Sequence, residues 1–276
     1  MPSNREVYFE ALKLDIPKAV IEFALKEVNG FSNLELTKNF DEEIKDYIFF
    51  KNAIKRYQDG EMIEYIFNKA YFLSTPFFVN KDVLIPRQET EQLVLRTIEL
   101  IKEIFDENRI NIADVCTGSG CIGISIAKAL PNNTYYLTDI SKEALRVAKN
   151  NTKALGDIDI KCLLGDMLEP LKEIKLDVIV CNPPYISKTE NIDKRTWDQE
   201  PHLALLAEPA TLYYEKVLSE YSSIVNSKYL LAFEIGEDMK EVLTKLVEKY
   251  YPDTTYFFEN DIYGKTRFLF IKQLGI

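Results

Sequence analysis

The sequence has few of the residues that serve metal and disulfide chemistry. It contains one histidine, His202, which lies outside the motifs described below, and four cysteines that form no paired Cys-x-x-Cys set. Because zinc sites need closely spaced cysteines and histidines, we expect no metal. Most of the cysteines adjoin or lie within apolar runs, so we expect buried free thiols in a reducing compartment.

Long apolar runs and clusters of basic residues are also missing. No apolar stretch reaches the roughly 20 residues that span a membrane, and the start, Met1–Arg5, has no signal-peptide core. We therefore expect a cytoplasmic protein that makes no membrane contact. Lys and Arg total 34 against 44 Asp and Glu, which gives a net charge of −10. This charge disfavours binding to a nucleic-acid backbone, so we expect a protein partner and no direct nucleic-acid contact.

What the chain does contain is enough length for two domains, with 276 residues of which 46% are hydrophobic. Residues 1–68 carry apolar positions at helical spacing, and Asp41 is a candidate helix cap. We predict a small helical bundle over 1–68 and a hairpin or linker over 69–83. Residues 84–276 are predicted to form the second domain.

The second domain alternates predicted strands and helices, which is typical of an α/β fold with a mostly parallel sheet. We predict strands at 111–115, 134–139, 158–164, 176–181, 228–235, 254–258 and 266–271. We predict helices at 121–130, 142–155, 209–225 and 238–250. The last two strands have no clear helix between them, so we expect a terminal hairpin. Ligands of such sheets bind at the carboxyl ends of the parallel strands.

A glycine-rich turn follows the first of these strands. Gly118, Gly120 and Gly123 have the spacing of a dinucleotide-binding fingerprint, and glycine lets a ligand approach the backbone closely. Asp139 ends the next strand, roughly twenty residues on, where a carboxylate can accept hydrogen bonds from ribose hydroxyls. Enzymes that use NAD and enzymes that use S-adenosylmethionine share these features, and a plain tight turn is a third reading. The glycine spacing leaves all three open.

The fourth strand ends in Asn182-Pro183-Pro184-Tyr185, the most informative segment of the sequence. Proline fixes its own φ and pushes the preceding residue into extended geometry. The Asn182 carboxamide and the Pro183 carbonyl are therefore two hydrogen-bond acceptors in a nearly rigid pair beside an aromatic ring. Such a pair suits the capture of a planar NH2 group, which points to a nitrogen-methylating enzyme. The alternative is a sharp exit turn with a capping asparagine.

Three observations favour S-adenosylmethionine as the cofactor. Asp166 follows Gly165 at the end of the third strand, a position from which its carboxylate can meet an adenine amino group. Asn182 lies on the same sheet edge as the glycine loop, and beside it if the strand order is 3-2-1-4. No residue pattern in the chain is typical of hydride transfer.

Taken together, these motifs resemble those of one known family. The matching segments are Leu84–Glu91, Asp114–Gly120, Asp139, Gly165-Asp166, Asn182–Ile186, Glu234–Gly236 and Asp261–Arg267. Their order and spacing are similar to those of HemK/PrmC enzymes, the glutamine-N5 methyltransferases that act on peptide chain release factors. The resemblance implies a seven-stranded, Rossmann-like class I S-adenosylmethionine-dependent methyltransferase domain. It also implies that the N-terminal bundle helps to recognise the release factor.

The resemblance further implies roles for individual residues, with methylation at the side-chain nitrogen of the glutamine in a Gly-Gly-Gln loop. The residues implied to bind the cofactor are Cys116, Thr117, Gly118, Ser119, Gly120, Asp139, Asp166, Met167 and Asn182. The substrate would be bound by Asn182, Pro183, Pro184 and Tyr185, of which Asn182, Pro183 and Tyr185 would be catalytic. The chain departs from the family pattern at Cys116, Gln88 and His202, where glycine, proline and arginine are common.

Other functions fit parts of the same pattern. A glutamine of a ribosomal protein, or the exocyclic amine of adenine in nucleic acid, would suit the same two acceptors. The net charge of −10 argues against adenine in nucleic acid. A binding protein that keeps the fold without catalysis is a further alternative, which the intact Asn182–Tyr185 segment and Asp139 argue against.

Overall fold

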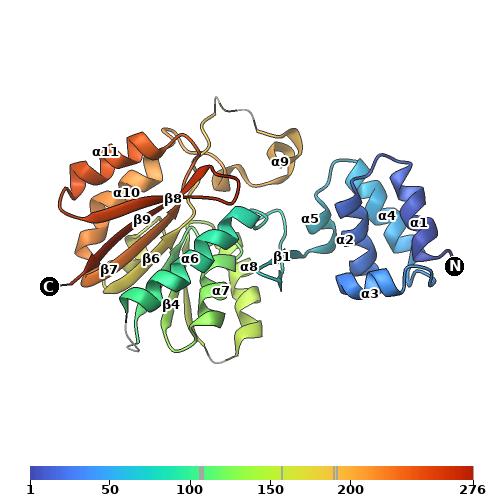
Figure 1. The fold of residues 1–276 in the computed structure, drawn as a ribbon, viewed down its shortest axis with the longest axis horizontal. Coiled ribbons are helices and arrows are strands. Elements are labelled where there is room, and N and C mark those ends of the chain that lie inside the picture. Colours follow the sequence, from blue (N-terminus) through green and yellow to red (C-terminus); the bar gives the residue numbers. More distant parts are fainter. Residues whose placement is uncertain (106–108, 157, 189, 191, 276) are drawn as a thin grey trace. The chain divides into compact units, whose positions relative to one another are not determined.

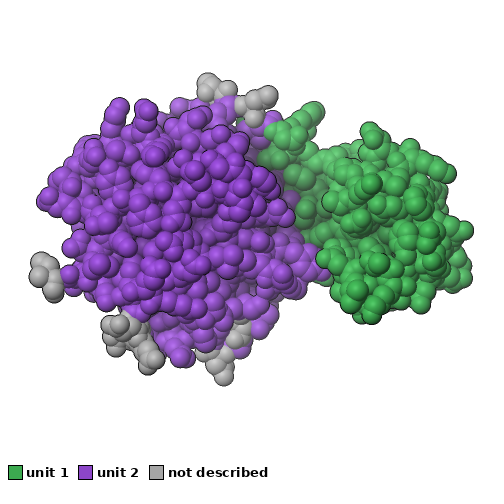
Figure 2. Space-filling model, in the orientation of Figure 1, with its two compact units in different colours: residues 1–69, 193–199 green, residues 70–192, 200–276 purple. Residues whose placement is uncertain are grey.

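The computed structural model describes residues 1–105, 109–156, 158–188, 190 and 192–275. The chain divides into two compact units, which Figure 2 shows in different colours. The first unit comprises Met1–Lys69 and Asp193–Gln199, and the second comprises Ala70–Ile192 and Glu200–Ile276. The segment Asp193–Gln199 therefore interrupts the second unit in the sequence but packs as part of the first.

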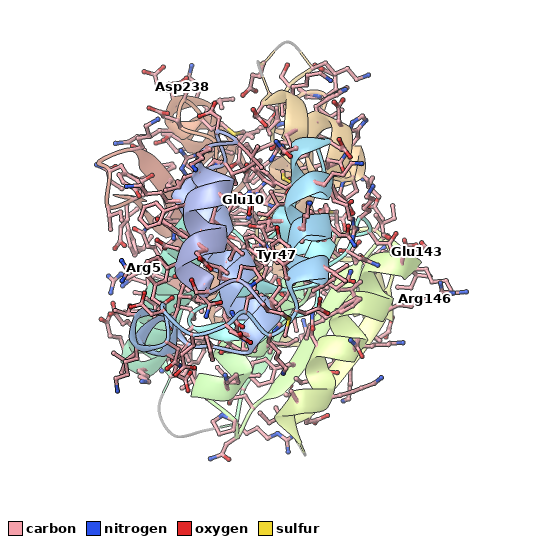
Figure 3. The ribbon with its side chains drawn as sticks, turned by 90° about the vertical axis from the view of Figure 1, so that its right-hand side faces the viewer. Arg5, Glu10, Tyr47, Glu143, Arg146 and Asp238 are labelled. Atoms are coloured by element: carbon pink, nitrogen blue, oxygen red, sulfur yellow. The ribbon has the colours of Figure 1, made fainter. Side chains whose placement is uncertain are left out.

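The first unit is helical. Its helices are α1 (Asn4–Leu12), α2 (Lys18–Asn29), α3 (Asn33–Lys38), α4 (Tyr47–Gln58), α5 (Ile63–Phe67) and α9 (Lys194–Gln199). Ser3 and Ser32 begin α1 and α3 with capping boxes, which satisfy backbone amides that a helix start leaves unpaired. The Tyr47 hydroxyl on α4 donates to Glu10 on α1 over 3.4 Å, and both side chains are labelled in Figure 3.

The start of α4 differs from the sequence-based expectation. Asp46 caps this helix, because its carboxylate accepts a hydrogen bond from the backbone amide of Phe49 at 2.8 Å. The predicted cap at Asp41 is wrong. Its carboxylate pairs instead with the Arg5 guanidinium on α1, so Asp41 ties two segments together rather than starting a helix.

The second unit contains a short hairpin and a seven-stranded sheet. The hairpin pairs β1 (Ala70–Phe72) with β2 (Thr75–Phe77). The sheet consists of β3 (Asn111–Val115), β4 (Thr134–Asp139), β5 (Asp159–Leu164), β6 (Leu176–Cys181), β7 (Val225–Glu234), β8 (Thr255–Asn260) and β9 (Thr266–Leu274). Its spatial order is β5-β4-β3-β6-β7-β9-β8, and only β9 runs antiparallel to its neighbours. The first four strands have the 3-2-1-4 order that places Asn182 beside the glycine loop, and the predicted terminal hairpin is confirmed.

Helices cover both faces of this sheet (Figure 1). They are α6 (Gln88–Ile104), α7 (Cys121–Ala129), α8 (Lys142–Thr152), α10 (Leu212–Glu220) and α11 (Lys240–Tyr250). Successive strand residues point to opposite faces: on β6, Val178 and Val180 join the core beneath α6 and α7, whereas Ile179 and Cys181 join the core beneath α10 and α11. The fold is thus a mostly parallel seven-stranded sheet between two helical layers. Among the described residues, no helix is long and apolar enough to cross a membrane.

The largest boundary difference lies between α10 and β7. A helix was predicted over 209–225, but α10 ends at Glu220 and a single 3-10 turn follows it. Strand β7 then begins at Val225, which pairs with Leu176 at the start of β6. This pairing extends β7 through the polar stretch 226–228, which the hydrophobic pattern does not mark as a strand.

Candidate active site

A pocket lies at the carboxyl ends of β3, β4, β5 and β6, within the second unit. The predicted site residues that line it are Cys116, Thr117, Gly118, Ser119, Asp139, Asp166, Met167, Asn182 and Pro184. The predicted residues Gly120, Pro183 and Tyr185 do not line it. The sheet topology therefore brings together side chains from four separate strand ends, as parallel strands do at a shared edge.

The loop after β3 is held by two buried or half-buried carboxylates. Asp114 accepts hydrogen bonds from the Thr117 hydroxyl at 2.6 Å and from the Gly123 amide at 2.8 Å. Asp139 accepts one from the Gly118 amide at 2.9 Å and one from the Ser141 amide at 2.9 Å. Burial raises the pKa of Asp114 to about 7, and it also raises the pKa of Asp139. The two carboxylates thus fix the loop through its backbone amides and the Thr117 hydroxyl.

Two positions in this loop require glycine for different structural reasons. Gly118 lines the pocket with a φ of +54°, and a Cβ at this position would meet no atom within 4 Å. Gly120 has a φ of +82° and begins α7, and a Cβ there would come within 2.9 Å of Ile124 Cδ1. Gly118 therefore leaves room for a ligand, whereas Gly120 leaves room for the protein core.

Beside the glycine loop, the pocket is lined by Cys116 and Met167 and by Asp166, which forms an ion pair. Cys116 Sγ lies 3.5 Å from Met167 Sδ, and both residues have positive φ values, of 60° and 50°. The Lys216 ammonium on α10 donates to Asp166 Oδ2 at 2.6 Å. Both side chains of this ion pair are about 40% exposed, at 38% and 40%. Lys216 was not predicted as a site residue, because it lies 50 positions from Asp166 on a separate element.

The Asn182 carboxamide is held from behind by two buried side chains. Its Nδ2 donates to Thr90 Oγ1 on α6 at 3.3 Å, and Thr90 Oγ1 donates to Glu234 Oε2 at the end of β7 at 2.6 Å. Thr90 and Glu234 are each 3% exposed. Burial raises the pKa of Glu234 to about 7 against the lowering effects of Thr90 and the Arg267 guanidinium. Sequence reasoning missed Thr90 and Glu234, although both lie in segments that carry the family resemblance.

The segments around this corner are tied to it by further contacts. Arg87 donates to Glu200 Oε2 at 2.5 Å, and Glu200 is buried at 3% exposure. The Ile186 amide donates to the Leu205 carbonyl at 3.0 Å. Tyr185 packs against the core beneath α10 and α11, and burial raises its pKa above the usual range. The chain on the far side of Asn182 is therefore anchored by backbone pairing and not by the prolines alone.

Comparisons with known proteins agree with this arrangement. A family described as "Methyltransferase small domain" matches residues 94–199. The release factor glutamine methyltransferase of Mycoplasma mycoides is 39% identical over 268 residues, which cover 94% of each chain. The enzyme of the same name from Bacillus cereus is 34% identical over 259 residues, 91% of each chain. This chain belongs to the release factor glutamine methyltransferase family.

A solved structure shows the same fold at lower identity. A methyltransferase from Pyrococcus furiosus superposes with a TM-score of 0.54 at 16% identity, covering 82% of this chain and 100% of that one. At this identity the likeness concerns the fold alone. The predicted fold class and the predicted enzyme family are both confirmed.

Proposed function

We propose that this protein transfers a methyl group from S-adenosylmethionine to the side-chain amide nitrogen of the glutamine in the Gly-Gly-Gln motif of a peptide chain release factor. The observation that carries the proposal is the position of Asn182. Asn182 lines the same pocket as Gly118 and Asp139, which supports a cavity shared by the residue proposed to bind the amide and the residue proposed to bind the ribose. The names of the relatives supply the substrate.

The residues present fit S-adenosylmethionine. Gly118 leaves open space on the pocket side, and the Asp139 carboxylate lines the pocket where ribose hydroxyls can donate to it. Cys116 to Ser119 would surround the methionine part, with Gly120 giving the turn room against the core, and Asp166 and Met167 would border the adenine. When bound, this cofactor supplies an electrophilic methyl group on a sulfonium.

The chain's own residues would act mainly by orientation. An amide nitrogen is a poor nucleophile because its lone pair is delocalised into the carbonyl. Asn182 Oδ1 and the carbonyl of Pro183, a buried residue outside the lining of the pocket, would accept the two N–H bonds of the glutamine and aim the nitrogen at the methyl group. Orientation of this kind contributes on the order of 7–11 kcal/mol in favourable systems. The same two acceptors stabilise the positive charge that grows on nitrogen in the transition state.

The other predicted substrate residues have supporting places in this proposal. Pro184 lines the pocket and would form part of the glutamine site. Tyr185 packs against the apolar core, so it would hold the corner from the protein side and help to exclude water. No general base is assigned, because the methylated nitrogen can lose its proton after transfer.

The helical unit is proposed to recognise the release factor. It carries exposed apolar side chains, including Phe9 at 50%, Leu34 at 63% and Ile48 at 74%. Such side chains suit contact with a folded protein substrate.

The test is an assay with methyl-labelled S-adenosylmethionine and separate candidate substrates. These are a release factor, the same factor with its Gly-Gly-Gln glutamine changed to alanine, a ribosomal protein, and duplex DNA. We expect label only in the intact release factor. Label that persists in the alanine version, or that enters the ribosomal protein or the DNA instead, would refute the proposal.

A further inference from the structure

The hydrogen-bond chain Asn182–Thr90–Glu234 joins three elements at the wall of the pocket, which Asn182 and Thr90 both line. Thr90 lies in the first turn of α6, Asn182 follows β6 and Glu234 ends β7. The contacts span 92 and 144 positions of sequence. The Glu234 backbone is itself fixed, because the Tyr214 hydroxyl donates to its carbonyl oxygen at 2.8 Å. The chain of contacts therefore ends on a rigid strand.

The direction of each hydrogen bond follows from the donor inventory of the groups. Above its raised pKa of about 7 the Glu234 carboxylate is ionised and can only accept, so the single Thr90 hydroxyl proton points to it. The Thr90 oxygen then has only lone pairs to offer Asn182, and of the two ends of a carboxamide only the NH2 can donate. The Asn182 Nδ2 must face Thr90, and Oδ1 must face away from it. No described residue donates a hydrogen bond to Asn182 Oδ1.

We infer that Thr90 and Glu234 are positioning residues that set which end of the Asn182 carboxamide meets the substrate. The inference rests on the proposed function, in which Oδ1 accepts an N–H of the glutamine. A carboxamide turned over by 180° would present its NH2 to the NH2 of the substrate. Two donors would then face one another, and the acceptor pair would be lost without any change in the shape of the pocket.

The chain supplies a matched control on the same helix. Thr97 also lies on α6 and is fully buried, at 0% exposure, and its hydroxyl has no hydrogen-bond partner among the described residues. Thr→Val keeps the shape of the side chain and removes the hydroxyl. Thr90→Val and Thr97→Val therefore make the same chemical change at two buried sites of one helix, and only the first breaks the chain to Asn182.

The kinetic experiment compares Thr90→Val, Thr90→Ser and Thr97→Val in full-length protein with a release factor as substrate. Loss of one orienting hydrogen bond should lower kcat about tenfold or more in Thr90→Val. The Kd for S-adenosylmethionine and the Tm should change little. Thr90→Ser, which keeps the hydroxyl, should restore kcat to within about threefold of wild type, and Thr97→Val should match wild type. Equal kcat values in Thr90→Val and wild type would overturn the inference, as would a loss shared by Thr97→Val.

A second measurement needs neither substrate nor turnover. In ¹⁵N-labelled wild-type protein, the side-chain NH2 protons of Asn182, assigned by their loss in Asn182→Ala, should show nuclear Overhauser contacts to the Thr90 methyl group. Absence of these contacts would overturn the inference. If the wild-type protein methylates no substrate offered, the proposed function fails, and the NH2 contacts still decide the orientation of Asn182.

Discussion

The two sides of the pocket are built in different ways. The loop after β3 is held by two backbone amides and the Thr117 hydroxyl, which donate to Asp114 and Asp139 over separations of at most 21 residues. The corner at Asn182 is held by side chains that come from 92 and 144 positions away. The loop is thus held by contacts between residues close in the sequence, whereas the Asn182 corner is held by contacts between segments far apart in the sequence. Mutations should therefore affect binding at the loop and chemistry at the Asn182 corner.

The largest effect is expected at the Asn182 corner. Asn182→Ala removes the Oδ1 acceptor and should abolish turnover, while cofactor binding is weakened but still detectable because Gly118 and Asp139 remain. Rates with labelled cofactor and the Kd from calorimetry measure the two quantities separately. A variant that methylates at nearly the wild-type rate would show that the acceptor pair is not the source of catalysis.

Asp139→Ala tests the loop side of the pocket. The carboxylate would lose its bonds to ribose and release the Gly118 amide, so the Kd for S-adenosylmethionine should rise roughly 10- to 100-fold, as expected for hydrogen bonds to a charged group. At saturating cofactor, kcat should fall much less. In Asp166→Ala the Kd for S-adenosylmethionine should rise less, because Asp166 is partly exposed and already paired with Lys216. An unchanged Kd in Asp139→Ala would remove this residue from the ribose site.

Gly118→Ala and Gly120→Ala test whether the first glycine leaves room for the ligand and the second leaves room for the protein core. Both residues have positive φ, so both variants carry backbone strain. Only the second adds a Cβ within 3.3 Å of Ala148 Cβ and Leu137 Cδ2, so Gly120→Ala should lose about 1–3 kcal/mol of stability from overpacking. Gly118→Ala should mainly weaken cofactor binding. Thermal unfolding with and without cofactor measures both effects, and a reversed order of Tm values would contradict the assignment.

The smallest effect concerns pH. Burial raises the pKa of Asp114 from its ordinary value of 3.8 to about 7 in the folded protein, and the charge on Asp139 contributes to the rise. Between these values the folded state binds the extra proton. The stability that this group contributes is therefore complete below its unfolded pKa and is lost as pH rises through its folded pKa.

Asp114→Asn keeps an oxygen for Thr117 and Gly123 but cannot ionise. The Tm of wild type should fall relative to that of Asp114→Asn as the pH is raised from about 5 to about 8. Parallel Tm curves over this range would show that Asp114 keeps the same charge in the folded and unfolded states.

The same division explains how much the sequence could predict. Strands β3, β4 and β6 match their predicted ranges, because buried parallel strands are continuous apolar runs that polar turns bound. The glycine loop, Asp139 and Asn182 were found because their spacing along the chain carries the signal. The pocket in the structure brings them together, while their roles in binding and catalysis stay predictions.

Other features depend on packing that no local pattern encodes. Asp41 and Asp46 are both plausible helix caps in the sequence, and only the ion pair with Arg5 separates them. Thr90 is one of several hydroxyl residues on a helix, and its partner Glu234 is known only once β7 is placed beside β6. The pairing of Lys216 with Asp166 likewise depends on where α10 packs, which the local sequence does not show.

The excursion of Asp193–Gln199 into the helical unit has a practical consequence for dissecting this protein. Arg195 in this segment donates to the Tyr57 carbonyl at 3.2 Å, and its guanidinium lies 3.8 Å from the centre of the Tyr57 ring. Removing residues 1–69 would leave Arg195 on the catalytic fragment without its partner Tyr57. Lost activity would then not by itself report lost recognition of the release factor. A clean domain deletion must replace residues 193–199 with a short linker as well.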